Sequence, residues 1–468
     1  MFVGRDKELE SLNKLYDQDK FQMVVMYGRR RVGKTTLVLK FIEDKPAIFF
    51  TAQEANDTIN LRMFSQKIYT FFGFPKGTSA FESWNDAFEF LADKAKTQKF
   101  VLAFDEFPYA SAENKSLKSI LQNCIDHKLK ETPMFMILCG SHIGFMENEV
   151  LGYKSPLFGR RTSQIKLEGF DYLDASKMMN NFSNEDKIRF YSCIGGTPHY
   201  LAQINQNETF EENINRLYFD ISGYLYNEPV MLLQQELREP AMYNSIVSAI
   251  AAGASRLNEI STKIAEDSSK VNKYLKTLID IGIICKQYPF GEDPLSSRKG
   301  IYKISDNCYN FWYRFVFLNR AEVESGNGDI IADNEVFGEE LSSFIGKPAF
   351  EQICLQYMLR KNKKGDLPFV ATSHGMWWGN DPIKRQQADF DIVFANRKEK
   401  KIILGECKWR NSVNVIGEIN SLIDKKYLMQ KYDDVYYYLF TKTDHSKEAK
   451  KLKTEKVKLV NTDMLFSI

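Results

Sequence analysis

The chain has 468 residues, of which 44% are hydrophobic and 26% charged, a composition typical of globular proteins with about two to four domains. The net charge of +2 excludes binding of nucleic acid by a uniformly basic surface, so any basic binding surface must be local. The seven cysteines stand singly and apart from the five histidines, and no apolar run approaches a membrane span, so we expect a reducing cytoplasmic setting without zinc motif, disulfide framework, signal peptide or membrane association.

A glycine-rich segment lies between a short apolar run at residues 23–26 and a helix-like run at residues 36–42. It fits the pattern G-x-x-x-x-G-K-[ST], with strand, loop and helix in the order that a phosphate-binding loop requires. The loop backbone would surround the phosphates of ATP, Lys34 would reach the β- and γ-phosphates, and the Thr35 hydroxyl would bind Mg²⁺. The predicted nucleotide contacts are Gly28, Arg29, Arg30, Arg31, Val32, Gly33, Lys34, Thr35 and Thr36.

The first 200 residues alternate apolar runs with helical periods, which predicts a parallel sheet with helices on both faces. A second strand is expected at residues 47–51 and another at residues 99–106, which ends in Asp105 and Glu106. Asp105 would hold Mg²⁺ through water, and Glu106 would polarise the attacking water. The alternative is a buried strand with two solvated acids at its end; behind a complete phosphate loop we favour the catalytic role.

A further strand at residues 134–139 is followed by Ser141. Ligands of open α/β sheets bind beyond the carboxyl ends of the strands, so Ser141 is either a group that senses the γ-phosphate or a plain turn serine. Arg160 and Arg161 are expected on an exposed turn. Either they are solvated, or one acts as an arginine finger, in its own chain or in a neighbouring copy of a homo-oligomer.

The opening residues 2–9, with Gly4 and Arg5, are similar to the box that packs on adenine in AAA+ and STAND-type ATPases. Together with the segments YGRRRVGKTTL, VLAFDEF, LCGSH, PLFGRR and CIGGTPHYL, they resemble the archaeal-type ATPase family within that superclass. The resemblance implies a P-loop domain over residues 1–205, ATP and Mg²⁺ as cofactors, and nucleotide contacts from Gly4 and Arg5. It also implies that residues 195–201 report the nucleotide state, although by themselves they indicate only a tight turn.

Residues 206–306 are predicted to be a helical region that ends in a winged helix-turn-helix. Lys270, Lys273 and Lys276 fall on the polar side of its third helix, where they would contact the DNA backbone. Only Asn272 suits the reading of base edges, which argues against sequence-specific recognition, and a role in protein contacts or as a hinge is the alternative. The expected helices are residues 242–250, 257–265 and 268–281, and the expected strands are residues 282–290 and 299–304.

Residues 307–334 are predicted to be a linker that opens with the strongly aromatic segment 307–316. Aromatic side chains stack on single-stranded bases, but the spacing and the single charge at Arg314 favour a buried helix. The segment also resembles the FWxRFV stretch found at this place in the archaeal-type family.

Residues 335–468 are predicted to form a separate domain. A helix is expected at residues 350–359 and carries Glu351 in its first turn. A hairpin is expected from strands at residues 389–395 and 401–409. Asp391 lies on the first strand. Glu406 and Lys408 are two residues apart on the second strand, so they face the same way.

An aspartate, a glutamate and a lysine that meet at a hairpin are the residues that metal-dependent phosphodiester cleavage requires. Asp391 and Glu406 would hold Mg²⁺ with Glu351 as a third carboxylate, and Lys408 would stabilise charge or position the nucleophile. The arrangement resembles the PD-(D/E)XK restriction-endonuclease-like superfamily, although Phe390 stands where its label has proline. The segments GKPAFEQI, MWWGN, DFDIVFA and LGECKW resemble the domain that follows the ATPase in the archaeal-type family. A surface hairpin with ordinary charges is the alternative.

The lysine-rich residues 442–458 are either a solvated helix face or a guide for a phosphate backbone. The sequence as a whole therefore predicts an α/β chain with a P-loop sheet, a winged helix and a restriction-endonuclease-like domain. We expect an ATP-hydrolysing protein that processes DNA. The alternative function is an ATP-driven switch whose C-terminal domain only binds a partner or nucleic acid.

Overall fold

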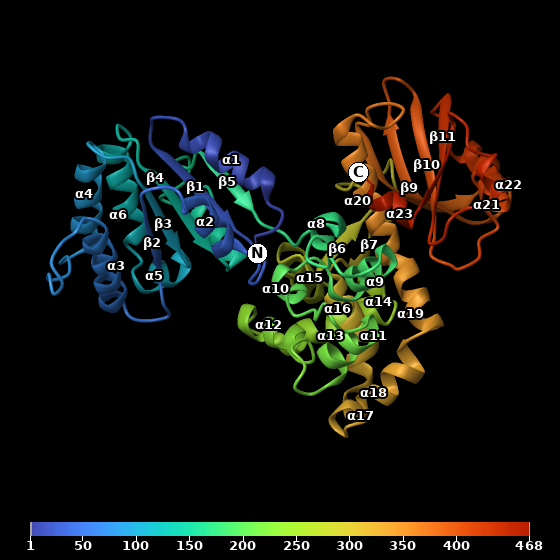
Figure 1. Cartoon of the computed structure of the whole chain (residues 1–468), viewed down its shortest axis with the longest axis horizontal. Coiled ribbons are helices and arrows are strands. Elements are labelled where there is room, and N and C mark those ends of the chain that lie inside the picture. The colour runs from blue at the N-terminus through green and yellow to red at the C-terminus, as the bar shows by residue number, and fades with distance from the viewer. Residues whose placement is uncertain (1, 468) are drawn as a thin grey trace. The chain divides into compact units, whose positions relative to one another are not determined.

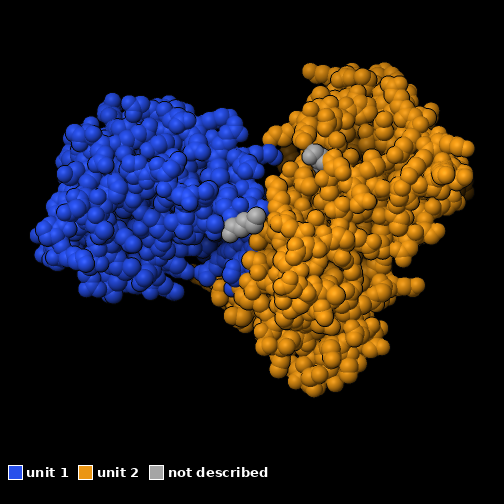
Figure 2. Space-filling model, in the orientation of Figure 1, with its two compact units in different colours: residues 1–169, 197–199 blue, residues 170–196, 200–468 orange. Residues whose placement is uncertain are grey.

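The computed structural model describes residues 2–467 and divides into two compact units, which Figures 1 and 2 display. Unit 1 comprises the chain up to Gly169 together with Thr197–His199, and unit 2 comprises Phe170–Gly196 and the chain from Tyr200 onward. The domain boundaries at residues 205, 306 and 334 stay a prediction.

Unit 1 is built on a five-stranded parallel sheet in the order β2-β3-β4-β1-β5, which confirms the predicted parallel sheet. The central strands are buried along their whole length, so both faces must be covered. Helices α1 and α2 cover one face and α3, α4 and α6 the other. The strands are β1 (Gln22–Tyr27), β2 (Ala47–Thr51), β3 (Val101–Asp105), β4 (Phe135–Gly140) and β5 (Ser163–Lys166). The helices are α1 (Asp6–Tyr16), α2 (Lys34–Ile42), α3 (Asp57–Phe71), α4 (Trp84–Ala95), α5 (Phe107–Glu113), α6 (Leu117–Cys124) and α7 (Ile143–Phe145).

Unit 2 begins with a helical region, which continues through three helices into a two-stranded antiparallel hairpin. These elements have the order predicted for residues 242–304, but the strands are shorter than expected. The chain leaves β6 early because Phe290 turns to the C-terminal sheet, where its N–H donates to the Met376 carbonyl at 2.6 Å. The elements are α8 (Tyr172–Ser176), α9 (Asn184–Ile194), α10 (Pro198–Leu201), α11 (Phe210–Ile214), α12 (Glu228–Glu236), α13 (Pro240–Ala251), α14 (Leu257–Lys263), α15 (Ser268–Asp280), β6 (Ile284–Gln287) and β7 (Ile301–Ile304).

The aromatic segment at residues 307–316 is a buried helix, as predicted. The rings of Tyr309, Trp312 and Tyr313 are almost fully buried, and the Trp312 indole N–H donates to the Tyr226 carbonyl at 2.6 Å. These rings therefore serve packing and are withdrawn from base stacking. The helices in this stretch are α16 (Asn307–Phe311), α17 (Arg320–Glu324), α18 (Gly328–Ile331) and α19 (Glu339–Phe344).

The rest of unit 2 is a mixed sheet in the order β12-β11-β10-β9-β8, in which β9 and β10 form the predicted antiparallel hairpin and β10, β11 and β12 are parallel. Helix α20 packs on one face and α21 on the other. Arg360 on α20 also forms ion pairs with Asp171 at 2.6 Å and Asp174 at 2.8 Å, so this sheet packs on the helical region. The elements are α20 (Glu351–Lys364), β8 (Ser373–Asp381), β9 (Gln386–Asn396), β10 (Lys401–Lys408), α21 (Val415–Asp424), β11 (Asp434–Thr441), α22 (Lys447–Lys450), β12 (Val457–Asn461) and α23 (Thr462–Phe466).

Among residues 2–467, none of the helices combines the length and the apolar character needed to span a bilayer.

Candidate functional sites

The phosphate-binding pattern forms a loop between the end of β1 and the start of α2. Gly28 comes directly after β1 and lies very close to the backbone of Leu167. A Cβ at this position would lie 2.2 Å from the Leu167 carbonyl oxygen. Gly33 has a φ of 90°, and Arg31 adopts a φ of 71° despite its side chain. The loop therefore curls tightly, as a backbone that wraps phosphates must.

Lys34 is buried at the start of α2, and its ammonium donates to the carbonyls of Gly28 and Arg29, both at 2.8 Å. The Thr35 hydroxyl donates to the Asp105 carboxylate at 2.9 Å, and Asp105 is itself 3% exposed. The hydroxyl and the carboxylate predicted for Mg²⁺ are thus brought together, although they lie 70 residues apart. Oxygen ligands of this kind fit Mg²⁺. Thr36, the next residue after Thr35 on α2, is exposed.

The opening segment holds the loop in place. Gly4 and Arg5 both have a left-handed backbone, with φ of 65° and 66°. The Arg5 guanidinium donates to the carbonyl of Val32 at 3.0 Å and to that of Glu168. Arg5 therefore ties the loop at Val32 to the segment after β5, and the Arg30 guanidinium donates to the Tyr109 hydroxyl at 2.9 Å.

Glu106 and Ser141 also meet, because β3 and β4 are neighbours in the sheet. The Ser141 hydroxyl donates to the Glu106 carboxylate at 2.9 Å, and the Ser141 N–H donates to the same oxygen at 3.2 Å. Glu106 follows β3 with a φ of 50°, and its N–H donates to the Asp105 carboxylate at 3.1 Å. Both acids thus lie with Ser141 at the carboxyl edge of the sheet, where the phosphate loop ends.

Of the two arginines predicted as finger candidates, Arg160 lies away from the loop. Arg160 lines a cavity of about 360 Å³ together with Lys20 and Phe21, which precede β1, so it lies at the sheet edge opposite the phosphate loop. Its guanidinium forms a fork-like pair with Asp126, with Nε 3.1 Å from each carboxylate oxygen. Arg161 precedes β5, but its charge acts toward the other end of the sheet, because it opposes the burial that raises the pKa of Tyr27, the last residue of β1. In its own chain, Arg160 therefore does not reach the loop.

Residues 197–199 belong to the same compact unit as the phosphate loop. A Cβ on Gly33 would lie 3.9 Å from the Pro198 ring, and burial together with the nearby Arg31 charge lowers the pKa of His199. The segment predicted to report the nucleotide state thus lies beside the loop.

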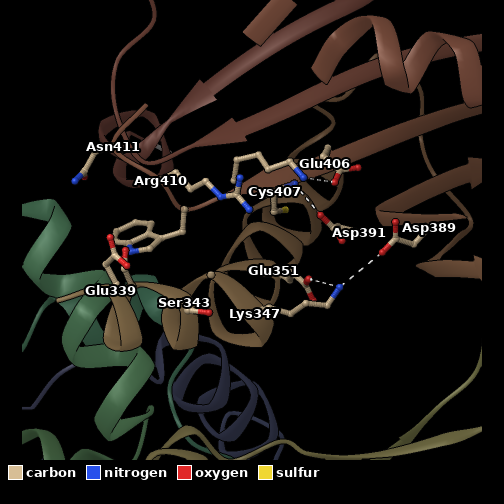
Figure 3. A pocket seen from close by; sticks show the side chains of 14 residues that line it. Glu339, Ser343, Lys347, Glu351, Asp389, Asp391, Glu406, Cys407, Arg410 and Asn411 are labelled. Atoms are coloured by element: carbon tan, nitrogen blue, oxygen red, sulfur yellow. Dashed lines mark hydrogen bonds and ion pairs between the residues drawn. The ribbon is translucent and has the colours of Figure 1, made fainter. Parts of the chain in front are cut away.

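Unit 2 contains an open cavity of about 630 Å³ at the β9–β10 hairpin, which Figure 3 shows from close by. Glu351 enters it from α20, Asp391 from β9, and Glu406 and Lys408 from β10. The structure therefore brings together the four residues that the sequence analysis selected. The three carboxylates are almost fully buried, at 5%, 5% and 8% exposure for Glu351, Asp391 and Glu406.

Burial, followed by the charges of Glu406 and Glu351, raises the pKa of Asp391 to about 8, although the Cys407 N–H donates to this carboxylate at 2.9 Å. Burial also raises the pKa of Glu351. Burial opposes the charge of Lys408, but the Glu406 carboxylate outweighs it and raises the pKa of Lys408; the two groups are 2.7 Å apart. The site thus concentrates more negative charge than its hydrogen bonds satisfy.

Two of these acids each keep a buried oxygen, Oε2 of Glu351 and of Glu406, without a hydrogen-bond partner. The Lys425 ammonium lies 3.6 Å from this Glu406 oxygen, within ion-pair range. Buried unpaired carboxylate oxygens fit a hard divalent cation. Even so, across residues 2–467 no three His, Cys, Asp or Glu side chains stand close enough to make a ready metal-binding group, so a cation would have to draw these carboxylates together.

Sequence analysis missed the lysines that surround the acids. Lys347 lies 3.3 Å from Glu351 and 3.7 Å from Asp389, as the dashed lines in Figure 3 show. Its i,i+4 spacing from Glu351 is a pattern that could have revealed it. Lys425 approaches Glu406 from a different element, and no local pattern predicts that contact.

Comparison with known proteins assigns the chain to a family. Residues 2–204 match the family described as an ATPase domain predominantly from Archaea, and residues 312–419 match a family of archaeal and bacterial proteins of unknown function. An uncharacterised protein of Methanocaldococcus jannaschii is 31% identical over 451 residues, which cover 96% of this chain and 97% of that protein. The chain belongs to the archaeal-type ATPase family.

Two further similar proteins are consistent with this assignment. An uncharacterised ATP-binding protein of M. jannaschii is 23% identical over 300 residues, which cover 51% of this chain and 76% of that protein. The Walker-type ATPase of Pyrococcus abyssi has the same fold, with a TM-score of 0.52 at 20% identity, and covers 67% of this chain and 96% of its own. The archaeal-type ATPase is thus an ATP-binding P-loop protein, and unit 1 has the P-loop NTPase fold.

Proposed function

We propose that this archaeal-type ATPase hydrolyses ATP and processes nucleic acid, with DNA as the expected substrate, through a metal-dependent phosphodiesterase site in unit 2. The observation that carries the proposal is the convergence of Asp391, Glu406 and Glu351 with Lys408 in one open cavity. Separate elements bury three acids there at a cost that a purely structural site has no reason to bear.

In unit 1, the proposed roles follow from the contacts. Lys34 would leave the loop carbonyls for the β- and γ-phosphates, and Thr35 with Asp105 would hold Mg²⁺. Glu106 is positioned beyond β3 to orient the attacking water, and Ser141 holds its carboxylate in place. Gly4 and Arg5 would support the adenine side of the site.

In unit 2, Asp391, Glu406 and Glu351 would hold a divalent cation. Such a cation polarises the scissile phosphate and lowers the pKa of a bound water. Lys408 is 2.7 Å from Glu406 on the same strand, from where its charge would stabilise the phosphate or position the nucleophile.

The surrounding fold supports this assignment. An antiparallel hairpin, then a helix, then a parallel strand is the arrangement expected of a restriction-endonuclease-like domain, and β9, β10, α21 and β11 follow that order. The hairpin module at residues 240–304 has the order of a winged helix-turn-helix, which would engage the nucleic acid.

One observation favours a second function, an ATP-driven switch whose C-terminal domain only binds a partner. Lys347, Lys408 and Lys425 all lie in ion-pair range of the cavity acids, so the chain itself neutralises much of their charge. A site that is neutralised internally needs no cation to fold.

Cleavage of plasmid and linear DNA with Mg²⁺ or Mn²⁺, with and without ATP, tests the proposal. We compare the wild type with Lys408→Ala, and use Lys401→Ala as the control because Lys401 lies on the same strand and pairs with Glu399 outside the cavity. Cleavage that Lys408→Ala abolishes and Lys401→Ala retains supports the nuclease. ATP hydrolysis without cleavage under every condition supports the switch.

A further inference from the structure

A second cavity in unit 2, of about 580 Å³, lies between the amino ends of α14 and α15 and the β6–β7 hairpin. Three cationic side chains line it, Arg256, Lys286 and Arg298, and none of its ten described lining residues is acidic. The remaining polar lining residues are Asn258, Ser268, Ser269, Asn272 and Tyr302. The lining therefore selects for an anion that accepts hydrogen bonds.

The arginines of this cavity are not committed to strong ion pairs. Arg298 is exposed, and in residues 2–467 it has neither an ion pair nor a hydrogen bond from its side chain. Arg256 lies 4.0 Å from Glu259, whose other carboxylate oxygen accepts the N–H groups of Ser255 and Arg256 at 2.8 and 3.0 Å. Both guanidinium groups are thus available to a ligand.

Lys286 is held in place as a charged group. Its ammonium lies over the rings of Tyr302 and Tyr288, at 5.1 and 5.5 Å from their centres. Burial opposes its charge, but the two tyrosines outweigh this effect and raise the pKa of Lys286. Gly300 leaves room for it, since a Cβ there would lie 2.8 Å from Lys286 Cε. A fixed cation, the exposed guanidinium of Arg298 and the loosely paired guanidinium of Arg256 together make a built anion site.

We propose that this cavity binds a backbone phosphate of nucleic acid. Asn272, the one residue of α15 suited to base edges, lies in its wall. On the outer side of α15, Lys270 is paired with Glu266 at 3.0 Å, whereas Lys273 and Lys276 are exposed and would add phosphate contacts outside the cavity. Only the identity of the polymer rests on the proposed function; binding itself needs no cleavage.

The hairpin explains why the ligand is a polymer rather than a free anion. Lys303 lies opposite Cys285, on the other face of the hairpin from Lys286 and Tyr302. Phe290, three residues after the end of β6, donates its N–H to Met376 of β8, which pairs with the strand of Asp391. The segment that follows β6 is therefore tied to the sheet that holds the carboxylate cavity, and a chain of phosphates offers a group to each cavity, whereas a single phosphate occupies one.

The test is fluorescence anisotropy with labelled short duplex and single-stranded DNA, in EDTA, at a series of KCl concentrations. The full-length chain carries Lys408→Ala, so that cleavage cannot interfere. Arg256→Ala and Arg298→Ala should each weaken binding by roughly 5- to 10-fold and reduce the slope of log K against log salt by about one. Lys299→Ala is the matched control, because Lys299 is the exposed neighbour of Arg298, pairs with Glu292 and does not line the cavity.

The proposal is overturned if both arginine variants bind with the affinity and salt slope of the parent, or if Lys299→Ala weakens binding equally. It is also overturned if the parent binds inorganic phosphate or ADP in this cavity and does not bind DNA. Cleavage is assayed separately, in the chain that retains Lys408. Weakened binding in Arg298→Ala without any cleavage by the Lys408 chain would refute the nuclease and support this site. Normal binding in Arg298→Ala with cleavage by the Lys408 chain would refute this site and support the nuclease.

Discussion

The phosphate loop and the carboxylate cavity differ in how far their charged groups are satisfied. In the loop, Lys34 donates hydrogen bonds to two carbonyls. Beside it, the Asp105 carboxylate accepts a hydrogen bond from the Thr35 hydroxyl, and the Glu106 carboxylate accepts one from the Ser141 hydroxyl. In the cavity, Glu351 and Glu406 each keep an unpartnered buried oxygen, and the pKa of Asp391 is about 8. The protein itself therefore satisfies the charged groups of the loop, whereas the cavity holds acids whose ionisation burial opposes and a bound cation would favour.

Loss of the carboxylate that we propose to orient the attacking water, Glu106, should have the largest effect. In Glu106→Gln, the amide oxygen still accepts from Ser141, but the negative charge that orients water is gone, so ATP turnover should fall by roughly 10²- to 10³-fold while ATP still binds. Phosphate release and nucleotide affinity measure the two quantities. Glu113→Gln, at the exposed end of α5, is the control, and wild-type turnover in Glu106→Gln would refute the role.

Lys34→Ala should weaken ATP binding by about 100-fold, because it removes the buried ammonium that the loop holds for the phosphates. Titration with a fluorescent ATP analogue measures the affinity. Lys40→Ala is the matched control on the same helix, where Lys40 is exposed and pairs with Glu43. Unchanged affinity in Lys34→Ala would show that the nucleotide binds elsewhere.

The same contrast decides what the sequence could predict. The phosphate loop is contiguous, so its pattern from Gly28 to Thr36 identifies strand, loop and helix at once, and the parallel sheet follows from the alternation of apolar and helical runs. The β9–β10 hairpin was equally predictable, since Asp391, Glu406 and Lys408 lie on adjacent strands with a short turn between them.

Tertiary contacts were out of reach. The Lys425 contact with Glu406 comes from an element after α21, and the Arg160 pair with Asp126 joins residues 34 positions apart. The packing of Phe290 on β8 shortens the hairpin for a reason that no local pattern contains. Sequence patterns specified which residues lie on one element, and packing between elements decided which charges they meet.

The buried charge of the carboxylate cavity predicts an unusual pH dependence. Because the pKa of Asp391 is about 8 in the folded chain and about 3.9 in an unfolded one, the folded state binds the proton more tightly, and its stability should fall as pH rises from about 4 to 8. Thermal melting in EDTA measures this trend. Asp391→Asn should flatten it, and Mg²⁺ or Mn²⁺ should restore stability at pH 8 in the wild type but not in Asp391→Asn.

Asp389→Asn is the matched control for this effect. Asp389 lies two residues earlier on the same strand and lines the same cavity, but it is exposed at the rim. If Asp389→Asn flattens the pH dependence as much as Asp391→Asn, the effect is a general surface charge effect and does not come from the buried carboxyl of Asp391.

The smallest effect concerns the arginine at the other edge of the unit 1 sheet. Arg160 is held by Asp126 and by the carbonyls of Pro156 and Phe158, both at 2.9 Å, so it serves the fold of its own chain. Arg160→Ala should lower the free energy of unfolding by roughly 1–2 kcal/mol and leave ATP turnover unchanged in dilute protein. Asp126→Asn removes the same pair from the other side and should have a similar effect on stability. Loss of turnover in Arg160→Ala alone, at concentrations where Asp126→Asn remains active, would show instead that Arg160 completes the site of a neighbouring copy.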